Sequence, residues 1–169
     1  MQIAVLHSKQ FRSACSKFPT GVTVTTVLGA DKEPYGITLN SFTSVSLDPP
    51  LVLVCIDHRS QILSHFFMGQ HFGVNILSEH QRELSVRFAG HWKERFSNVS
   101  WFPGVTGVPL LFHAAGFLEC QITKLEPAGD HLVVMGSVVN VVSTELAPLA
   151  YFNSCYGKID PSGSKPESD

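Results

Sequence analysis

Two long segments late in the chain alternate between apolar and polar side chains, and they constrain the fold more than any other feature. Over 116–125 we expect the apolar set to face inward and the polar set to face outward. The inward set is Leu118, Cys120 and Ile122, and the outward set is Glu119, Gln121 and Thr123. A second apolar segment, 131–142, follows the turn residues 126–130. This pattern predicts a long antiparallel hairpin.

Strand signals recur along the rest of the chain, whereas helix signals are few. Segments rich in Val, Ile, Thr and Phe predict strands over 22–28, 35–40, 51–56 and 72–77. Helices are expected over 9–17, 61–68 and 78–89. Many strands with few helices are typical of a mainly β protein, a closed or split barrel with flanking helices.

The third helix carries the clearest terminal signals. Ser78 and Gln81 have the spacing of a capping box at its start, and Gly90 stands where a C′ glycine would end it. Leu84 and Phe88 lie four residues apart, so they share one face of the helix. We expect this face to pack on the barrel.

Length and composition fit one domain. A chain of 169 residues buries about 70% of its unfolded surface, which is enough for a full core. We assign 1–159 to this domain and 160–169 to a polar tail whose composition predicts disorder. The formal net charge of −2 gives no reason to expect a nucleic acid partner.

The remaining composition indicates a cytoplasmic protein without a metal. None of the four cysteines has Cys-x-x-Cys spacing, and reduced thiols are expected. The first residues lack the cationic start and apolar core of a signal peptide, and no apolar stretch is long enough to span a membrane. The histidines are scattered without zinc-site spacing. No Gly-x-Gly-x-x-Gly follows a strand, so NAD(P)H would have to bind without a Rossmann domain.

The segment 36–51 combines strand character with a dense set of hydroxyl and amide side chains. Its polar members are Thr38, Asn40, Ser41, Thr43, Ser44 and Ser46. These side chains and the backbone N–H groups between them are suited to line a site for a flat polar ring. The alternative is an edge strand with a Ser/Thr-rich face in solvent. For Asn40 and Ser41 in particular, a local Asx-type turn is the competing interpretation.

The loop 57–60 joins an apolar strand to a helix and has the chemistry of an anion site. Ser60 is placed to cap the helix, whose first N–H groups would point at a negative group, and Arg59 adds a cation. The competing interpretation is a capped surface helix with a solvated arginine.

Taken together, the motifs resemble the flavin reductase family, which has the FMN-binding split-barrel fold, a Greek-key β-barrel. The resemblance covers about 9–158 in uninterrupted order. Besides the polar run, it rests on Phe18-Pro19-Thr20-Gly21-Val22, Leu51-Val52-Leu53-Val54-Cys55-Ile56, Phe72-Gly73-Val74-Asn75-Ile76-Leu77-Ser78, Gly129-Asp130-His131 and the segment from Tyr151 to Gly157.

The resemblance implies a role for each of these groups. The flavin phosphate would lie at Asp57, Arg59 and Ser60, with a second phosphate-side segment at Arg87, Ala89 and Gly90. The flavin ring would lie along Thr38, Leu39, Asn40, Ser41 and Thr43, where fixed donors favour the negative charge of the reduced ring. The nicotinamide would contact Thr20, His131 and Tyr156. A rim histidine and a packing tyrosine are the alternatives for the last two.

The implied activity is NAD(P)H-dependent reduction of FMN or FAD by hydride transfer, which requires no acid. Similar proteins are homodimers that supply reduced flavin to a monooxygenase. Two other functions stay open. One is a reductase whose bound flavin serves another acceptor, such as a cobalt corrin. The other is a non-enzymatic flavin- or haem-binding barrel.

Overall fold

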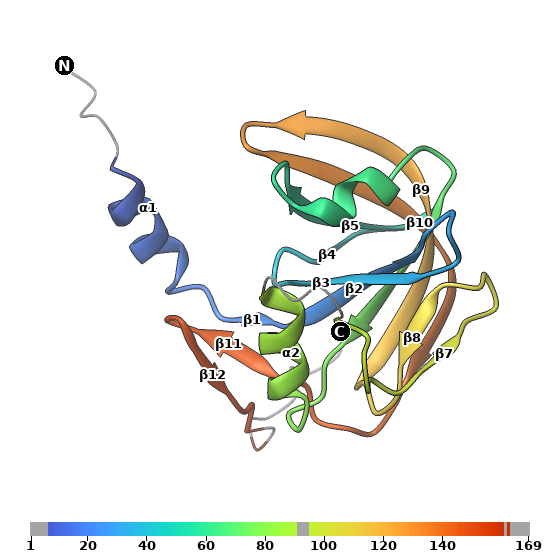
Figure 1. Ribbon diagram of the computed structural model, residues 1–169. Coiled ribbons are helices and arrows are strands. Elements are labelled where there is room, and N and C mark those ends of the chain that lie inside the picture. Colours follow the sequence, from blue (N-terminus) through green and yellow to red (C-terminus); the bar gives the residue numbers. More distant parts are fainter. Residues whose placement is uncertain (1–6, 91–94, 161, 163–169) are drawn as a thin grey trace.

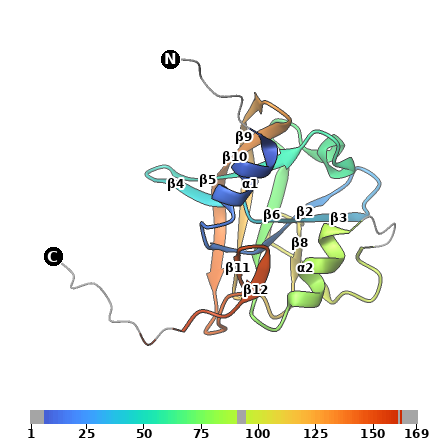
Figure 2. The ribbon, with the colours of Figure 1, turned by 90° about the vertical axis from the view of Figure 1, so that its left-hand side faces the viewer.

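The computed structural model describes residues 7–90, 95–160 and 162, and its main feature is a curled antiparallel sheet of seven strands (Figures 1 and 2). In spatial order the strands are β3 (Pro34–Leu39), β2 (Thr23–Leu28), β6 (His71–Ile76), β9 (Gly116–Ala128), β10 (His131–Ser143), β5 (Pro50–Asp57) and β4 (Thr43–Leu47). Within the described ranges no pairing joins the edge strands β3 and β4, so the sheet stays open between them. The predicted mainly β class is confirmed.

The long hairpin predicted from the alternation is β9–β10. Each strand has 13 residues, and His131 pairs with Ala128, so that only Gly129 and Asp130 form the turn. The turn is shorter than the predicted 126–130 because β9 continues through Ala128. Gly129 has a φ of +64°, a conformation that glycine adopts without steric cost.

The prediction that Glu119 faces solvent is wrong, because its side chain is fully buried. The loop between β7 (Trp101–Pro103) and β8 (Pro109–Leu111) lies over this face of β9 and supplies hydrogen bonds to the carboxylate. The donors are the backbone N–H of Val105 at 3.0 Å, the backbone N–H of Thr106 at 2.7 Å, the Thr106 hydroxyl at 2.5 Å and Asn140 Nδ2 at 2.8 Å. Alternation predicts which face a side chain occupies, but not what covers that face.

The core has two parts. The larger fills the inside of the curled sheet with apolar side chains that include Val27, Val54, Ile56, Phe72, Val74, Cys120, Ile122 and Val134. The smaller lies where the sheet meets α2 (Arg82–Ala89) and includes Val22, Val24, Leu77, Phe88, Leu111 and Leu149. A three-stranded sheet of β1 (Thr20–Gly21), β11 (Ala150–Phe152) and β12 (Cys155–Gly157) borders this second part.

Helix α2 packs closely on β3, as its apolar face predicts. Phe88 is fully buried and Leu84 is partly buried in the smaller core. A Cβ at Gly36 of β3 would lie 2.7 Å from the Phe88 ring, so this approach depends on glycine. This packing places the C-terminal end of β3 beside α2, where the candidate site lies.

The predicted boundaries of α2 are corrected at both ends. The helix begins at Arg82 rather than at 78, because Ser78 forms a β-bridge with Pro148 and a turn follows. Half of the capping box forms, since Gln81 Oε1 accepts the Ser78 N–H at 3.0 Å. The buried Ser78 hydroxyl has no partner within the described part of the chain. Gly90 has an extended backbone with a φ of −79° and is not the left-handed C′ residue predicted.

The helix predicted over 61–68 is a 3₁₀ turn, η1 (Gln61–His65). It ends early because Phe66 adopts an extended conformation. The Phe66 ring and the Ile62 side chain both lie in the core. Ser60 precedes η1, but its side chain makes no capping hydrogen bond, so the predicted cap is wrong.

The N-terminal helix α1 (Ser8–Cys15) lies within the predicted 9–17 region apart from Ser8, and it projects from the body of the molecule (Figure 1). None of its residues is buried. Apart from Asp160 and Ser162, the expected tail 160–169 lies outside the described residues. No helix in the described part of the chain is long and apolar enough to cross a membrane.

Candidate functional site

One pocket gathers side chains from three of the separated motifs. It has a volume of about 180 Å³ and lies between the ends of β2 and β3, helix α2 and the small sheet. Its lining residues are Val22, Thr38, Asn40, Ser85, Ala89, Tyr151 and Tyr156. Thr38 and Asn40 come from the polar run, Ala89 from the end of α2 and Tyr156 from the C-terminal segment. The fold thus brings together residues to which the resemblance assigns flavin and nicotinamide contacts.

Ser85 links three elements at the wall of this pocket. Its carbonyl accepts a hydrogen bond from Thr38 Oγ1 at 2.6 Å, and its hydroxyl lies 2.8 Å from the Tyr156 hydroxyl. The Tyr156 ring contacts Tyr151 edge to face at 5.3 Å, and the Arg82 guanidinium lies 5.5 Å from its centroid. These contacts hold β3, α2 and β12 around one space.

The polar run is divided between two strands and a loop. β3 ends at Leu39, the loop 40–42 follows, and β4 begins at Thr43. In the described part of the chain the exposed Asn40 side chain makes no hydrogen bond, so it is available to a ligand. The Ser41 hydroxyl accepts the Cys55 N–H at 3.0 Å and donates to the Cys55 carbonyl at 3.1 Å, and it therefore fixes the loop to β5.

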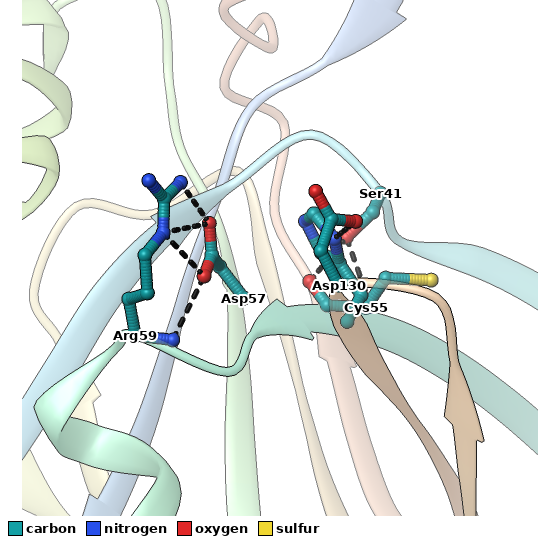
Figure 3. A network of polar contacts seen from close by, with 6 residues as sticks. Ser41, Cys55, Asp57, Arg59 and Asp130 are labelled. Atoms are coloured by element: carbon teal, nitrogen blue, oxygen red, sulfur yellow. Dashed lines mark hydrogen bonds and ion pairs between the residues drawn. The ribbon is translucent and has the colours of Figure 1, made fainter.

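The polar network of Figure 3 has contacts at two points of β5, where Ser41 binds Cys55 and where Asp57 binds Arg59. Asp57 ends β5 and accepts hydrogen bonds from the Arg59 backbone N–H at 2.8 Å, from Nε at 3.0 Å and from Nη2 at 2.6 Å. These bonds hold the pKa of Asp57 well below its usual range. The Arg59 side chain is 88% exposed, so its guanidinium is oriented by Asp57 and still open to a ligand.

His131 lies across the strand pair from Asp57. Its Nδ1 is 2.7 Å from Asp130 Oδ1, and this hydrogen bond lowers the pKa of Asp130. A carboxylate only accepts, so Nδ1 carries the proton and Nε2 is left to face a ligand. The His58 N–H donates to the Asp130 carbonyl at 3.0 Å and ties the loop with Arg59 to the turn with His131.

The other predicted residues are less directly placed. Thr43 lies on the exposed edge strand β4, where its hydroxyl donates to the Ser44 carbonyl, so the edge-strand interpretation describes this half of the polar run. Leu39 is half buried against the larger core. Arg87 donates to the Ser97 carbonyl, and the Gly90 carbonyl accepts Arg95 Nη2 at 2.7 Å. The Thr20 hydroxyl is buried and has no hydrogen-bond partner among the residues that the structure describes, and Thr20 pairs with Tyr151 between β1 and β11.

Three pocket residues, Ser85, Tyr151 and Val22, were given no site role from the sequence. Tyr151 and Val22 lie in motifs that carry the resemblance, whereas Ser85 does not. Ser85 left one signal, since it is a hydroxyl residue on the face of α2 that carries Phe88 three residues later. The pairing of Ser85 with Tyr156 spans 71 residues and has no local signature. Among the described residues no group of His, Cys, Asp and Glu side chains is arranged to hold a metal ion.

Comparison with protein families places this geometry in context. The family model described as "Flavin reductase like domain" matches residues 15–160, which include the pocket and the polar network. The chain belongs to the flavin reductase family. This confirms the resemblance read from the separated motifs.

Individual relatives agree with this membership. The reductase subunit Stc3 of stachydrine N-demethylase from Rhizobium meliloti is 39% identical over 156 residues, which cover 92% of this chain and 68% of Stc3. A flavin reductase (NADH) from Kitasatospora aureofaciens is 40% identical and is matched over 88% of this chain and 80% of its own length. Two further curated relatives are about twice as long as the matched region, which covers 50% and 49% of them.

A solved structure extends the agreement to the fold. The NADH:FAD oxidoreductase SgcE6 of Streptomyces globisporus, in complex with NAD and FAD fragments, superposes with a TM-score of 0.87 at 34% identity. The match covers 96% of this chain and all of SgcE6. The split-barrel fold expected for a flavin reductase is therefore present.

Proposed function

We propose that this protein catalyses the NAD(P)H-dependent reduction of FMN or FAD. The observation that carries the proposal is the pocket, in which Thr38, Asn40, Ala89 and Tyr156 meet although they come from separate motifs. Relatives named as flavin reductases support the reaction class. The bound flavin supplies the hydride acceptor, and the protein's residues bind and orient the two ring systems.

The residues present fit a flavin. The free amide of Asn40 both donates and accepts, which suits the alternating carbonyl and N–H groups of the ring edge. Thr38 and the aromatic rings of Tyr151 and Tyr156 supply a mixed polar and apolar wall. Arg59, which Asp57 holds at the end of β5, offers its outer guanidinium edge to a phosphate.

His131 is proposed as the nicotinamide contact. Its Nε2 is oriented by the Asp130 hydrogen bond and can bind the carboxamide or attract the anionic dinucleotide. Hydride transfer moves no proton to or from this side chain, so His131 acts in binding and orientation.

We further propose that two copies of this chain associate and that α1 takes part. An isolated helix of 8 residues is marginal in water, yet no α1 residue is buried, and Phe11 and Phe18 are 56% and 74% exposed. A second copy would cover these rings. The names of relatives that are reductase subunits support a flavin-dependent monooxygenase as the recipient of reduced flavin. The four free cysteines suit a cytoplasmic location.

The reaction is tested by adding NADH or NADPH to the purified protein with FMN or FAD in the absence of oxygen. We expect the visible absorbance of the flavin to bleach and to return when oxygen is admitted. Transfer of electrons from a bound, reduced flavin to an added cobalt corrin would indicate the alternative acceptor. Flavin or haem binding without any bleaching by either nucleotide would contradict the proposed reaction.

A further inference from the structure

Two hydroxyl groups form a pair in the wall of the pocket. Ser85 Oγ and the Tyr156 hydroxyl lie 2.8 Å apart, and either atom can be the donor on distance alone. Ser85 is fully buried, whereas Tyr156 is partly exposed and lines the pocket. In the part of the chain that the structure describes, neither hydroxyl has another hydrogen-bond partner.

The burial of Ser85 decides the direction of this hydrogen bond. Each hydroxyl has one proton, and the pair uses only one of the two. If Tyr156 donated, the Ser85 proton would be buried without an acceptor, which costs about 1–3 kcal/mol. Ser85 therefore donates to Tyr156, and the phenol proton remains at the surface of the pocket.

The surroundings fix the direction of the phenol. The Ser85 backbone is held by its N–H to the Gln81 carbonyl at 3.1 Å and by its own carbonyl, which accepts Thr38 Oγ1. The Tyr156 ring is held by Tyr151, at an interplanar angle of 62°, and by the Arg82 cation. This cation near the ring favours an electron-rich acceptor at the hydroxyl.

We propose that Tyr156 is a hydrogen-bond donor to a carbonyl oxygen of the planar ring bound in the pocket, and that Ser85 is the positioning residue that directs it. The inference rests on the proposed function and names a contact within that site. Two rings in the reaction carry such an oxygen, since the flavin has ring carbonyls and the nicotinamide has a carboxamide. The shared chemistry is a ring-borne carbonyl acceptor, and the two sources are separated by experiment.

The experiment compares Tyr156→Phe, Ser85→Ala and the double variant with the wild-type protein. The dissociation constants of FMN and FAD are measured by titration, and the KM and kcat for NADH and NADPH by steady-state reduction. Tyr156→Phe is expected to weaken one ligand about 3- to 10-fold, the worth of one uncharged hydrogen bond. Ser85→Ala is expected to weaken the same ligand by a smaller factor, with a larger change in the binding constant or KM than in kcat. The double variant is expected to be no weaker than Tyr156→Phe alone.

The ligand that loses affinity identifies the acceptor. A weaker flavin with an unchanged nucleotide KM assigns a flavin carbonyl, and the reverse assigns the carboxamide. Tyr35→Phe is the matched control, because Tyr35 donates to Asp31 at 2.6 Å on the β2–β3 hairpin, outside the pocket. Its ligand constants should equal those of the wild type.

Two results would overturn the inference, namely wild-type constants in Tyr156→Phe, or losses that simply add in the double variant. Tyr156→Phe keeps the ring and its packing, so the first result is accessible even if Ser85→Ala does not fold. Failure of the proposed function is a different result, since the wild-type protein would then bind flavin without reducing it. The flavin dissociation constants would still test Tyr156 in that case.

Discussion

At the residue scale, two carboxylates orient basic side chains at the candidate site. Asp57 holds Arg59 through its side chain and backbone, and Asp130 holds His131 through Nδ1. Each pair leaves one edge of its basic side chain toward solvent. Orientation before binding reduces the entropy lost when a ligand is bound, which is why an exposed ion pair of little worth for stability can still matter for affinity.

Arg59→Ala is expected to weaken flavin binding about 3- to 10-fold, a modest factor because the guanidinium is exposed and screened by solvent. The dissociation constant should also lose part of its dependence on salt concentration. Lys124→Ala is the control, since Lys124 forms a surface ion pair with Glu126. Equal flavin affinity in Arg59→Ala and wild type would remove the phosphate assignment.

His131→Ala is expected to raise the KM for the nicotinamide nucleotide while the flavin dissociation constant stays near that of the wild type. The reason is that the imidazole is the proposed nicotinamide contact and hydride transfer moves no proton to or from it. Steady-state kinetics at saturating flavin measure the effect, with His80→Ala, a surface histidine beside Glu79, as the comparison. An unchanged KM would return His131 to the role of a rim residue.

At the element scale, buried polar groups join the β7–β8 ribbon to the main sheet. Glu119 on β9 binds the loop between these strands, and Asn75 on β6 accepts the Leu111 N–H at 2.7 Å while donating to the Val24 carbonyl at 3.0 Å. Burial alone would raise the pKa of Glu119, but hydrogen bonds from Thr106, Asn140 and Val105 lower it overall. The ribbon is thus held by a charged group that is stabilised in its ionised form.

Glu119→Gln is expected to lower the free energy of unfolding at neutral pH by about 1–3 kcal/mol, because an amide cannot accept from all of these donors. Since the folded-state pKa lies below the unfolded value of about 4.3, the ionised wild type is more stable above that value and loses this stability as the pH falls through the folded pKa. Denaturant unfolding at neutral and acidic pH should therefore give a difference between the two proteins that shrinks in acid. Glu126→Gln, on the exposed hairpin, should show no comparable difference, and a constant gap for Glu119→Gln across pH would contradict the account.

At the scale of the whole molecule, the strand framework followed from the sequence because its signals are local. Alternation with a period of two predicted β9 and β10, and apolar runs predicted β2, β5 and β6 within two residues at each end. The cover over Glu119 and the pairing of Ser85 with Tyr156 join residues far apart in sequence, so no local pattern predicted them. The site residues Thr38, Asn40, Ala89 and Tyr156 were predicted from the family resemblance, and physical patterning alone left the polar run divided between a ligand site and an edge strand.

Association of two copies is tested by the mass of the protein in solution. The double variant Phe11→Glu, Phe18→Glu should lower the mass from that of a dimer to that of a monomer, because the charges cannot be buried against a second copy. Light scattering after gel filtration measures this, with Val86→Glu on the exposed face of α2 as the matched change. A dimeric double variant, or a monomeric wild type, would contradict a role for α1 in association.

If the pocket beside α2 holds the flavin, a side chain that fills this pocket prevents flavin binding. Ala89 is exposed on the last turn of α2 and lines the pocket, so that a larger side chain there occupies ligand space without entering the core. The measurement is the flavin dissociation constant of Ala89→Trp, compared with Ala30→Trp on the exposed β2–β3 turn, after circular dichroism shows that both variants are folded. We predict that Ala89→Trp no longer binds flavin and that Ala30→Trp binds it as the wild type does. Wild-type flavin affinity in folded Ala89→Trp would place the flavin outside this pocket.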